Sequence, residues 1–160
     1  PLFVEDIAGH AILRARGNTP IAVGENLHMA YAFENFMLRG AVDFIQPDVA
    51  RAGGITEIRK ITALAAQHKV PVSFHTWGDG VALAASVHLS AALKDCIVME
   101  LDYTYNPLRE ELLRDPFKVE NGYLTPPDRP GLGIELNPSA LQRFAFAGFE
   151  DLTIRQKTLA

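Results

Sequence analysis

Short apolar runs alternate with longer amphipathic segments along most of this chain. Five runs rich in β-branched and other apolar residues cover 2–5, 20–24, 44–46, 70–74 and 97–101. Runs of this kind are typical of strands that are buried on both faces of a parallel sheet. The pattern therefore predicts an α/β fold in which strands and helices alternate.

The segments between the runs have the period of helices. Residues 29–38 carry apolar and aromatic side chains at helical spacing, and Gly40 follows as a good left-handed terminator. The glycine pair 53–54 opens a second segment, whose isoleucines mark one face and whose charged residues lie mainly on the other. An alanine-rich helix is expected over 82–93. These helices would connect successive parallel strands.

In the last third of the chain the alternation of apolar runs and amphipathic segments ends. Asn121-Gly122 lies between Lys-Val-Glu and Tyr-Leu-Thr, which predicts a hairpin, and several prolines follow it. Asn137 and Pro138 are expected to be the cap and first position of a short terminal helix. We therefore expect residues 1–115 to form part of a βα barrel and residues 116–160 to form an arm.

Four acidic or imidazole side chains stand at or just after the ends of the last four apolar runs, namely Glu25, Asp48, His75 and Glu100. Their spacings of 23, 27 and 25 residues match one βα unit each. In a (β/α)8 barrel the carboxyl ends of the strands meet at one rim, where catalytic groups converge. The spacing therefore predicts an enzyme. A complete barrel takes about 250 residues, so five strands would be only a part of one.

Glu5 follows the first run in the way that Glu25 follows the second. Two carboxylates at neighbouring strand ends repel each other unless a cation lies between them, and hard oxygen ligands suit Mg²⁺. Two carboxylates with separate salt bridges would account for the same spacing. The residues leave both interpretations open.

Asp48 and His75 follow neighbouring strands, where the carboxylate could hydrogen-bond one imidazole nitrogen and leave the other as a general base. A structural histidine is the simpler alternative. Glu100 could hydrogen-bond a substrate oxygen if it kept its proton, which burial beside other acids favours, or it could be a solvated surface residue. Trp77 would either line a substrate pocket or pack beneath a loop.

The composition of the chain limits the partners and the cellular compartment that we expect for it. The net charge of −4 includes no basic run that could follow a phosphate backbone, which argues against nucleic acid. Cys96 is the sole cysteine, so an internal disulfide is impossible and a reducing cytoplasm is expected. The longest small and apolar stretch, 81–93, is too short to span a membrane. We expect a soluble cytoplasmic protein.

Four segments together resemble a known family, the enolase superfamily and specifically its mandelate racemase subgroup. They are Pro-Ile-Ala-Val-Gly-Glu-Asn (20–26), Ile-Gln-Pro-Asp-Val-Ala-Arg-Ala-Gly-Gly-Ile-Thr-Glu (45–57), Phe-His-Thr-Trp-Gly (74–78) and Met-Glu-Leu-Asp (99–102). The resemblance covers nearly the whole chain and implies a TIM-type (β/α)7β barrel, of which these residues would be the last five strands. The muconate cycloisomerase branch is less similar, because a lysine would be expected there at position 48.

The resemblance also implies roles for the strand-end residues. Glu5 and Glu25 would be two of three Mg²⁺ ligands, and Asp48 and His75 the dyad in which His75 moves the proton α to a carboxylate. Glu100 would be the acid that faces the substrate carboxylate. The implied reaction passes through an enediolate and uses Mg²⁺.

Three departures from the family pattern affect what can be carried over. The third metal ligand, an Asp, and a lysine acid/base pair belong on strands before Glu5, and Ile7 stands where the family usually has proline. The 20 residues from Glu5 to Glu25 are also short for a complete βα unit, which indicates either a shortened helix or residues missing between about Asp6 and Gly17. We expect the chain to be the C-terminal part of a longer protein, with its arm packing toward a capping domain.

The leading hypothesis for function is an acid-sugar dehydratase that acts on an aldonate or aldarate. A racemase or epimerase of a 2-hydroxy acid begins with the same proton transfer and is the alternative. A hypothesis of another class is a non-catalytic barrel fragment that is kept for assembly. The expected partners are a small-molecule carboxylate and further copies of the chain, since barrel enzymes often form symmetric homo-oligomers.

Overall fold

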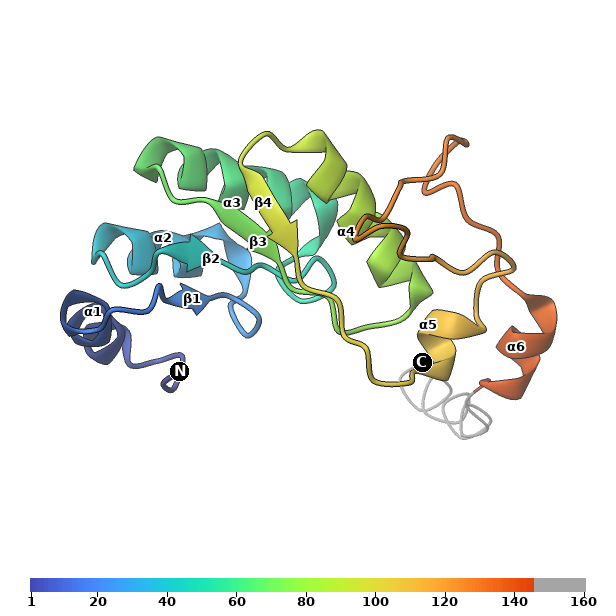
Figure 1. The fold of residues 1–160 in the computed structure, drawn as a ribbon, viewed down its shortest axis with the longest axis horizontal. Helices are drawn as coiled ribbons and strands as arrows, with labels where there is room; N and C mark the ends of the chain where they lie inside the picture. The colour runs from blue at the N-terminus through green and yellow to red at the C-terminus, as the bar shows by residue number, and fades with distance from the viewer. Residues whose placement is uncertain (146–160) are drawn as a thin grey trace, which may run out of the picture.

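The strands of the computed structural model form one parallel sheet, and the structure describes residues 1–145 (Figure 1). The sheet order follows the chain: β1 (Ala22–Val23), β2 (Phe44–Ile45), β3 (Val72–Phe74) and β4 (Cys96–Met99). The helices that connect neighbouring strands are α2 (Met29–Leu38), α3 (Gly54–His68) and α4 (Gly80–Ala92). Each neighbouring pair of strands is parallel, which confirms the predicted α/β class.

The first apolar run is not a strand, so the prediction of a fifth strand at residues 2–5 is wrong. The Asp6 amide donates to the Phe3 carbonyl at 3.0 Å, which closes a turn. The Asp6 side chain then accepts the Gly9 amide at 2.8 Å as the N-cap of α1 (Ile7–Arg16). Because the cap starts a helix at once, Glu5 lies in a turn instead of at a strand end. The short segment 6–17 is thus occupied by a ten-residue helix.

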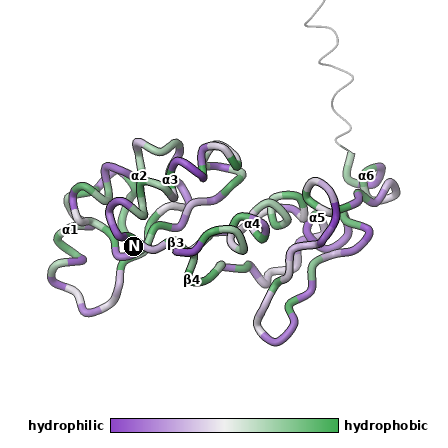
Figure 2. The backbone as a smooth tube through the Cα atoms, turned by 90° about the horizontal axis from the view of Figure 1, so that it is seen from above, coloured by the Kyte–Doolittle hydropathy of each residue, from purple (hydrophilic) through white to green (hydrophobic). Residues whose placement is uncertain are grey.

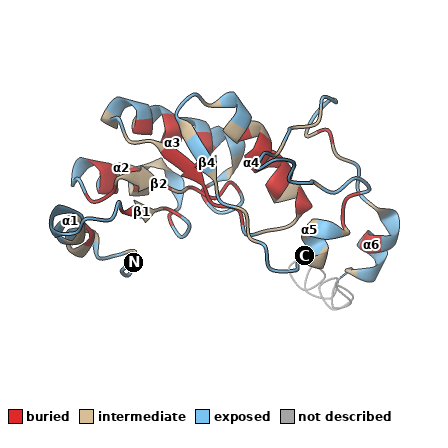
Figure 3. Cartoon of the chain, in the orientation of Figure 1, coloured by how far each residue is buried: buried red, intermediate tan, exposed pale blue. Residues whose placement is uncertain are grey.

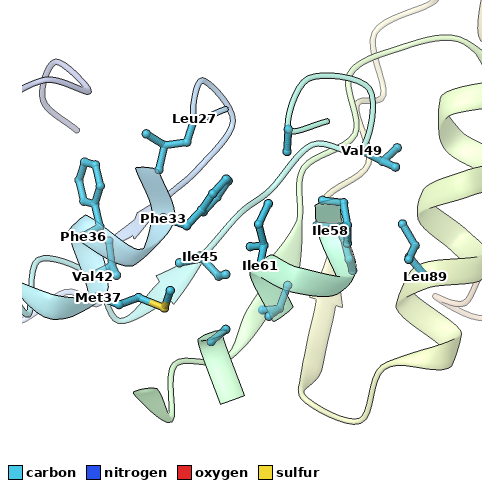
Figure 4. Packing of buried hydrophobic residues seen from close by; sticks show 14 of the residues in the cluster. Leu27, Phe33, Phe36, Met37, Val42, Ile45, Val49, Ile58, Ile61 and Leu89 are labelled. Atoms are coloured by element: carbon cyan, nitrogen blue, oxygen red, sulfur yellow. The ribbon is translucent and has the colours of Figure 1, made fainter. Parts of the chain in front are cut away.

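The hydrophobic core lies between the sheet and the connecting helices. Figures 1 and 2 place α2 and α3 on one side of the strands, and Figure 4 shows their apolar side chains meeting those of the sheet. The most deeply buried large apolar residues of this core are Phe33, Phe36, Ile45, Ile58, Ile61, Val72 and Phe74. Burying side chains of this size supplies about 1.5–3 kcal/mol each, which holds the short strands in register.

A partly exposed ion pair contributes to the attachment of helix α1, whose buried His10 also packs edge-on against Phe36. The Arg14 Nε donates to Asp43 Oδ1 at 2.7 Å, and the Ile21 amide donates to Asp43 Oδ2 at 2.8 Å. The Ile21 amide, and after it the Arg14 guanidinium, hold the pKa of Asp43 below its ordinary value. A lowered pKa means that the stabilisation is present above the pKa of the unfolded chain, about 3.9, and is lost as the pH falls through the folded value.

Replacing Asp43 by Asn is therefore expected to lower the free energy of unfolding by about 0.5–1.5 kcal/mol near neutral pH. The difference from the wild type should shrink as the pH falls from about 5 to about 3, because the wild-type carboxylate then becomes protonated. Thermal unfolding at a series of pH values measures it. Asp128→Asn, which removes an exposed carboxylate of the arm, should give no such trend. A difference that is constant with pH would contradict the expectation.

Among the described residues the arm contains one short helix, α6 (Pro138–Arg143), and a second short helix, α5 (Pro107–Glu110), precedes the arm. Asn137 caps α6 and Pro138 is its first residue, as predicted. The predicted hairpin is reduced to one tight turn, with positive φ angles at Asn121 (54°) and Gly122 (82°) and a single bridge between Glu120 and Tyr123. Figure 3 shows the arm as mostly exposed or half-buried. Its division from the barrel part at residue 115 stays a prediction.

The sheet is open at β4. The side chains of Ile97 and Val98 are 53% and 60% exposed, although the sequence suggested a strand buried on both faces. An edge strand has only one neighbour to cover it, which explains the difference. Among residues 1–145, no helix is long and apolar enough to cross a membrane.

Candidate active site

The ends of the four strands are fixed side by side by backbone hydrogen bonds. The Gln46 amide donates to the Val23 carbonyl at 2.9 Å, and the His75 amide donates to the Pro47 carbonyl at 3.2 Å. The Glu100 amide reaches the carbonyl of Phe74 at 2.8 Å. These bonds continue the parallel ladder past each strand, so the residues that follow the strands lie along one edge of the sheet.

Asp48 and His75 are joined by a buried hydrogen bond. His75 Nδ1 lies 2.9 Å from Asp48 Oδ2, and the two residues are only 6% and 5% exposed. The other carboxylate oxygen accepts the Ala50 amide at 2.8 Å, so the carboxylate cannot rotate freely. A carboxylate oxygen is an acceptor, which places the imidazole proton on Nδ1 and leaves Nε2 with a lone pair. This is the arrangement that a general base requires.

Glu25 lies on the far side of the imidazole from Asp48. Its Oε2 is 3.7 Å from His75 Nε2, and its side chain is 58% exposed. Gly24, the preceding residue, lies against the backbone of Gln46, where a Cβ atom would come within 2.6 Å of a backbone atom. Glycine thus allows β1 and β2 to approach closely at the point where Glu25 leaves the sheet. The structure brings Glu25, His75 and Asp48 into one row.

Glu5 and Glu25 line the same cavity, whose volume is about 480 Å³. Asn26 and Gln46 add amide groups to its wall. The donor set is made of hard oxygen atoms and fits Mg²⁺ in kind. Within the described residues, however, no three His, Cys, Asp or Glu side chains come close enough together to hold a metal. Further ligands would have to be water or groups outside the described part.

Glu100 does not touch the dyad. It is exposed, and its Oε2 accepts a hydrogen bond from Gln46 Nε2 at 3.1 Å. The burial beside other acids that the sequence suggested is therefore absent among the described residues. Gln46 was not among the predicted site residues, because a neutral amide at a strand end carries no charge signal. Its place at the end of the third apolar run is the signal that could have identified it.

Trp77 is 71% exposed. No loop of the described residues covers it, so both alternatives that the sequence left open stay predictions for the whole protein.

A parallel α/β sheet with a buried Asp–His pair and carboxylates along its carboxyl edge is what part of an α/β barrel would present at its catalytic rim. Residues 1–140 match the family described as Enolase C-terminal domain-like. The chain therefore belongs to the enolase superfamily, as its sequence motifs indicated.

Three relatives illustrate the similarity. The chain is 41% identical over 152 residues to the D-galactarolactone cycloisomerase of Agrobacterium fabrum, covering 90% of this chain and 40% of the relative. It is 35% identical over 145 residues to the D-gluconate dehydratase of Thermoproteus tenax, covering 90% and 29%. The crystal structure of the 3,6-anhydro-D-galactonate cycloisomerase from Zobellia galactanivorans superimposes with a TM-score of 0.84 at 40% identity, covering 90% and 41%. The chain thus spans 29% to 41% of the length of these relatives.

Proposed function

We propose that this chain supplies the general base and part of the metal site of an enzyme that removes the proton α to the carboxylate of a sugar acid. The observation that carries the proposal is the buried Asp48–His75 hydrogen bond with Glu25 beside the free Nε2. Asp48 would hold the imidazole in the tautomer that accepts a proton at Nε2. His75 would take the α-proton of the substrate there.

The rate that a general base can supply is too small without a positive charge to stabilise the reaction. A positioned base supplies a factor of about 10² to 10⁴ in rate, whereas enzymes generally accelerate reactions by about 10⁶ or more. Glu5 and Glu25 would hold Mg²⁺, and the bound cation would stabilise the negative charge that develops on the substrate carboxylate. Both glutamates line the cavity next to the dyad, which supports this assignment.

Loss of an oxygen substituent from the β-carbon is the step that we favour after proton removal. The protonated His75 would return its proton to the departing oxygen. In a dehydratase the oxygen leaves as water, in keeping with the similarity to D-gluconate dehydratase. Glu100 would orient the acid, as its place at the end of the neighbouring strand suggests.

A cycloisomerase is the second candidate, because two of the similar proteins carry that name. In a 3,6-anhydro sugar acid the ring oxygen is bonded to the carbon β to the carboxylate. The same proton removal at the α-carbon can then open the ring without loss of water. The two candidates thus share the role of His75 and differ only in whether the departing oxygen remains attached to the substrate.

One experiment separates these reactions. The protein is incubated with Mg²⁺ in D₂O and a panel of aldonates, aldarates, their lactones and 3,6-anhydro sugar acids, and the products are analysed by mass spectrometry. A 2-keto-3-deoxy acid that has lost one water from its substrate identifies a dehydratase, and a keto acid of unchanged composition identifies a cycloisomerase. Deuterium at the α-carbon without keto acid would indicate a racemase or epimerase. Silence across the panel would refute the proposal and favour the non-catalytic fragment.

A further inference from the structure

One short segment connects the loops that follow His75 and Glu100. It runs from residue 102 to residue 109 and leads from β4 into α5, as Figure 1 shows. Neither the dyad nor the candidate metal ligands belong to it. Its hydrogen bonds nevertheless reach both loops, and they centre on two side chains, Arg109 and Asn106.

Arg109 fixes the loop that follows Glu100. Its side chain is 10% exposed, and Nη1 donates to Asp102 Oδ2 at 3.3 Å. The second terminal nitrogen donates to the Thr104 carbonyl and lies 3.2 Å from Glu110 Oε1. Because Asp102 follows Glu100 by two residues, the guanidinium holds that loop through a side chain and a backbone carbonyl together.

Asp102 is an ionised partner for this guanidinium. Its carboxylate accepts the Thr104 amide at 2.8 Å, and that amide, with a smaller contribution from Arg109, lowers the pKa of Asp102. The ion pair is partly buried, with side-chain exposures of 10% for Arg109 and 18% for Asp102, so removing one member leaves the other charge poorly compensated. The pair is therefore expected to hold its geometry near neutral pH.

Asn106 joins the same segment to the loop that follows His75. Its Nδ2 donates to the Gly78 carbonyl at 3.1 Å, three residues after His75. Its Oδ1 accepts the Leu108 amide at 3.0 Å as the N-cap of α5. One asparagine thus binds the β3 loop to the helix from which Arg109 binds the β4 loop.

We propose that Arg109 and Asn106 are positioning residues, which keep the loops after His75 and Glu100 in one fixed arrangement. The catalytic part of this inference rests on the proposed function. A displacement of about 1 Å in a catalytic group can lower the rate by about 10²-fold, so loops that carry such groups need support. Both residues act through backbone and carboxylate contacts at a distance from the reacting atoms.

The first test compares three arginine variants of the protein. Arg109→Met keeps most of the aliphatic stem and removes the charge, whereas Arg109→Lys keeps the charge and loses the planar fork. We expect Arg109→Met to lower kcat by about 10- to 100-fold, with KM changed less than about threefold. The kcat of Arg109→Lys should lie between that of Arg109→Met and that of the wild type. The matched control is Arg114→Met, whose side chain is 58% exposed and pairs with Glu135 at 3.5 Å. The control should retain kcat within about twofold.

Hydrogen exchange provides a readout that does not depend on activity. In Arg109→Met the amides of 100–105 should exchange at least about tenfold faster, while those of α3 keep their protection. Asn106→Ser is a milder variant, because serine can still cap α5. Its shorter side chain loses the hydrogen bond that Asn106 Nδ2 donates to the Gly78 carbonyl. It should accelerate exchange in 76–80.

The outcomes separate the two proposals. Unchanged exchange in both loops, or faster exchange that extends equally to α3, would overturn the positioning role. A kcat that falls only in proportion to the unfolded fraction would overturn it as well. A wild-type protein without activity on any sugar acid would instead refute the proposed function, and the exchange measurements alone would then decide whether the two residues hold the loops.

Discussion

Replacing His75 by Asn is expected to lower kcat by about 10² to 10⁴-fold, the contribution of a positioned general base. Asparagine offers no lone pair of comparable basicity at the place of Nε2. The substrate α-proton should then exchange with D₂O at a rate reduced by the same factor. Both rates can be followed by proton NMR with whichever sugar acid the panel identifies as substrate.

Asp48→Asn should lower kcat by a similar factor, but it should do so by changing the tautomer of His75. Its amide group can donate to Nδ1, which would move the imidazole proton to Nε2 and remove the lone pair that faces Glu25. His68→Asn is the matched control, because His68 ends α3 before the chain enters β3 and so lies at the opposite edge of the sheet. If His75→Asn kept more than about a tenth of the wild-type exchange rate, His75 would not be the base.

The contact between Asp48 and His75 could be predicted from the sequence because two simple rules act together. Each residue follows an apolar run, and neighbouring parallel strands present their carboxyl ends at the same edge. The structure adds an isolated bridge between these two residues and the hydrogen bond of their side chains. The position of each residue after a strand and the parallel pairing of the two strands together place these side chains side by side. The prediction therefore did not require the exact bounds of the strands.

The misplaced first strand shows where a local pattern is insufficient. Residues 2–5 have the same apolar composition as the true strands, but Asp6 directly after them is an N-cap. The capping hydrogen bond starts α1 before the run can pair with β1. Helix α5 shows the same effect, because Asn106-Pro107 starts it in the way that Asn137-Pro138 starts α6, although no apolar pattern marks it. An N-cap residue can therefore determine where a helix begins even when the neighbouring apolar run suggests a strand.

The exposure of Glu100 could not be predicted from its neighbours in the sequence. Its strand has the composition of a buried strand, but whether a strand is central or at an edge depends on what lies beside it in space. Within the described residues β4 has a neighbouring strand on one side only, and Glu100 is exposed there and accepts a hydrogen bond from the Gln46 amide. The contact with Gln46 spans 54 residues, a separation that no local pattern reveals.

Replacing Glu25 by Gln is the second change with a large expected effect. The amide keeps the shape of the side chain but removes the charge that a hard divalent cation prefers. We expect the Mg²⁺ concentration for half-maximal activity to rise by at least about tenfold, with kcat lowered at saturating Mg²⁺. Titration calorimetry with Mg²⁺ measures the loss of binding directly.

Glu120→Gln provides the control, because it removes one negative charge from the exposed turn of the arm and leaves the site unchanged. Glu5→Gln should weaken Mg²⁺ binding as well, since Glu5 lines the same cavity as Glu25. Its effect distinguishes a shared cation from two independent carboxylates. If Glu25→Gln weakened binding and Glu5→Gln did not, the turn that replaces the first strand would have removed Glu5 from the metal site.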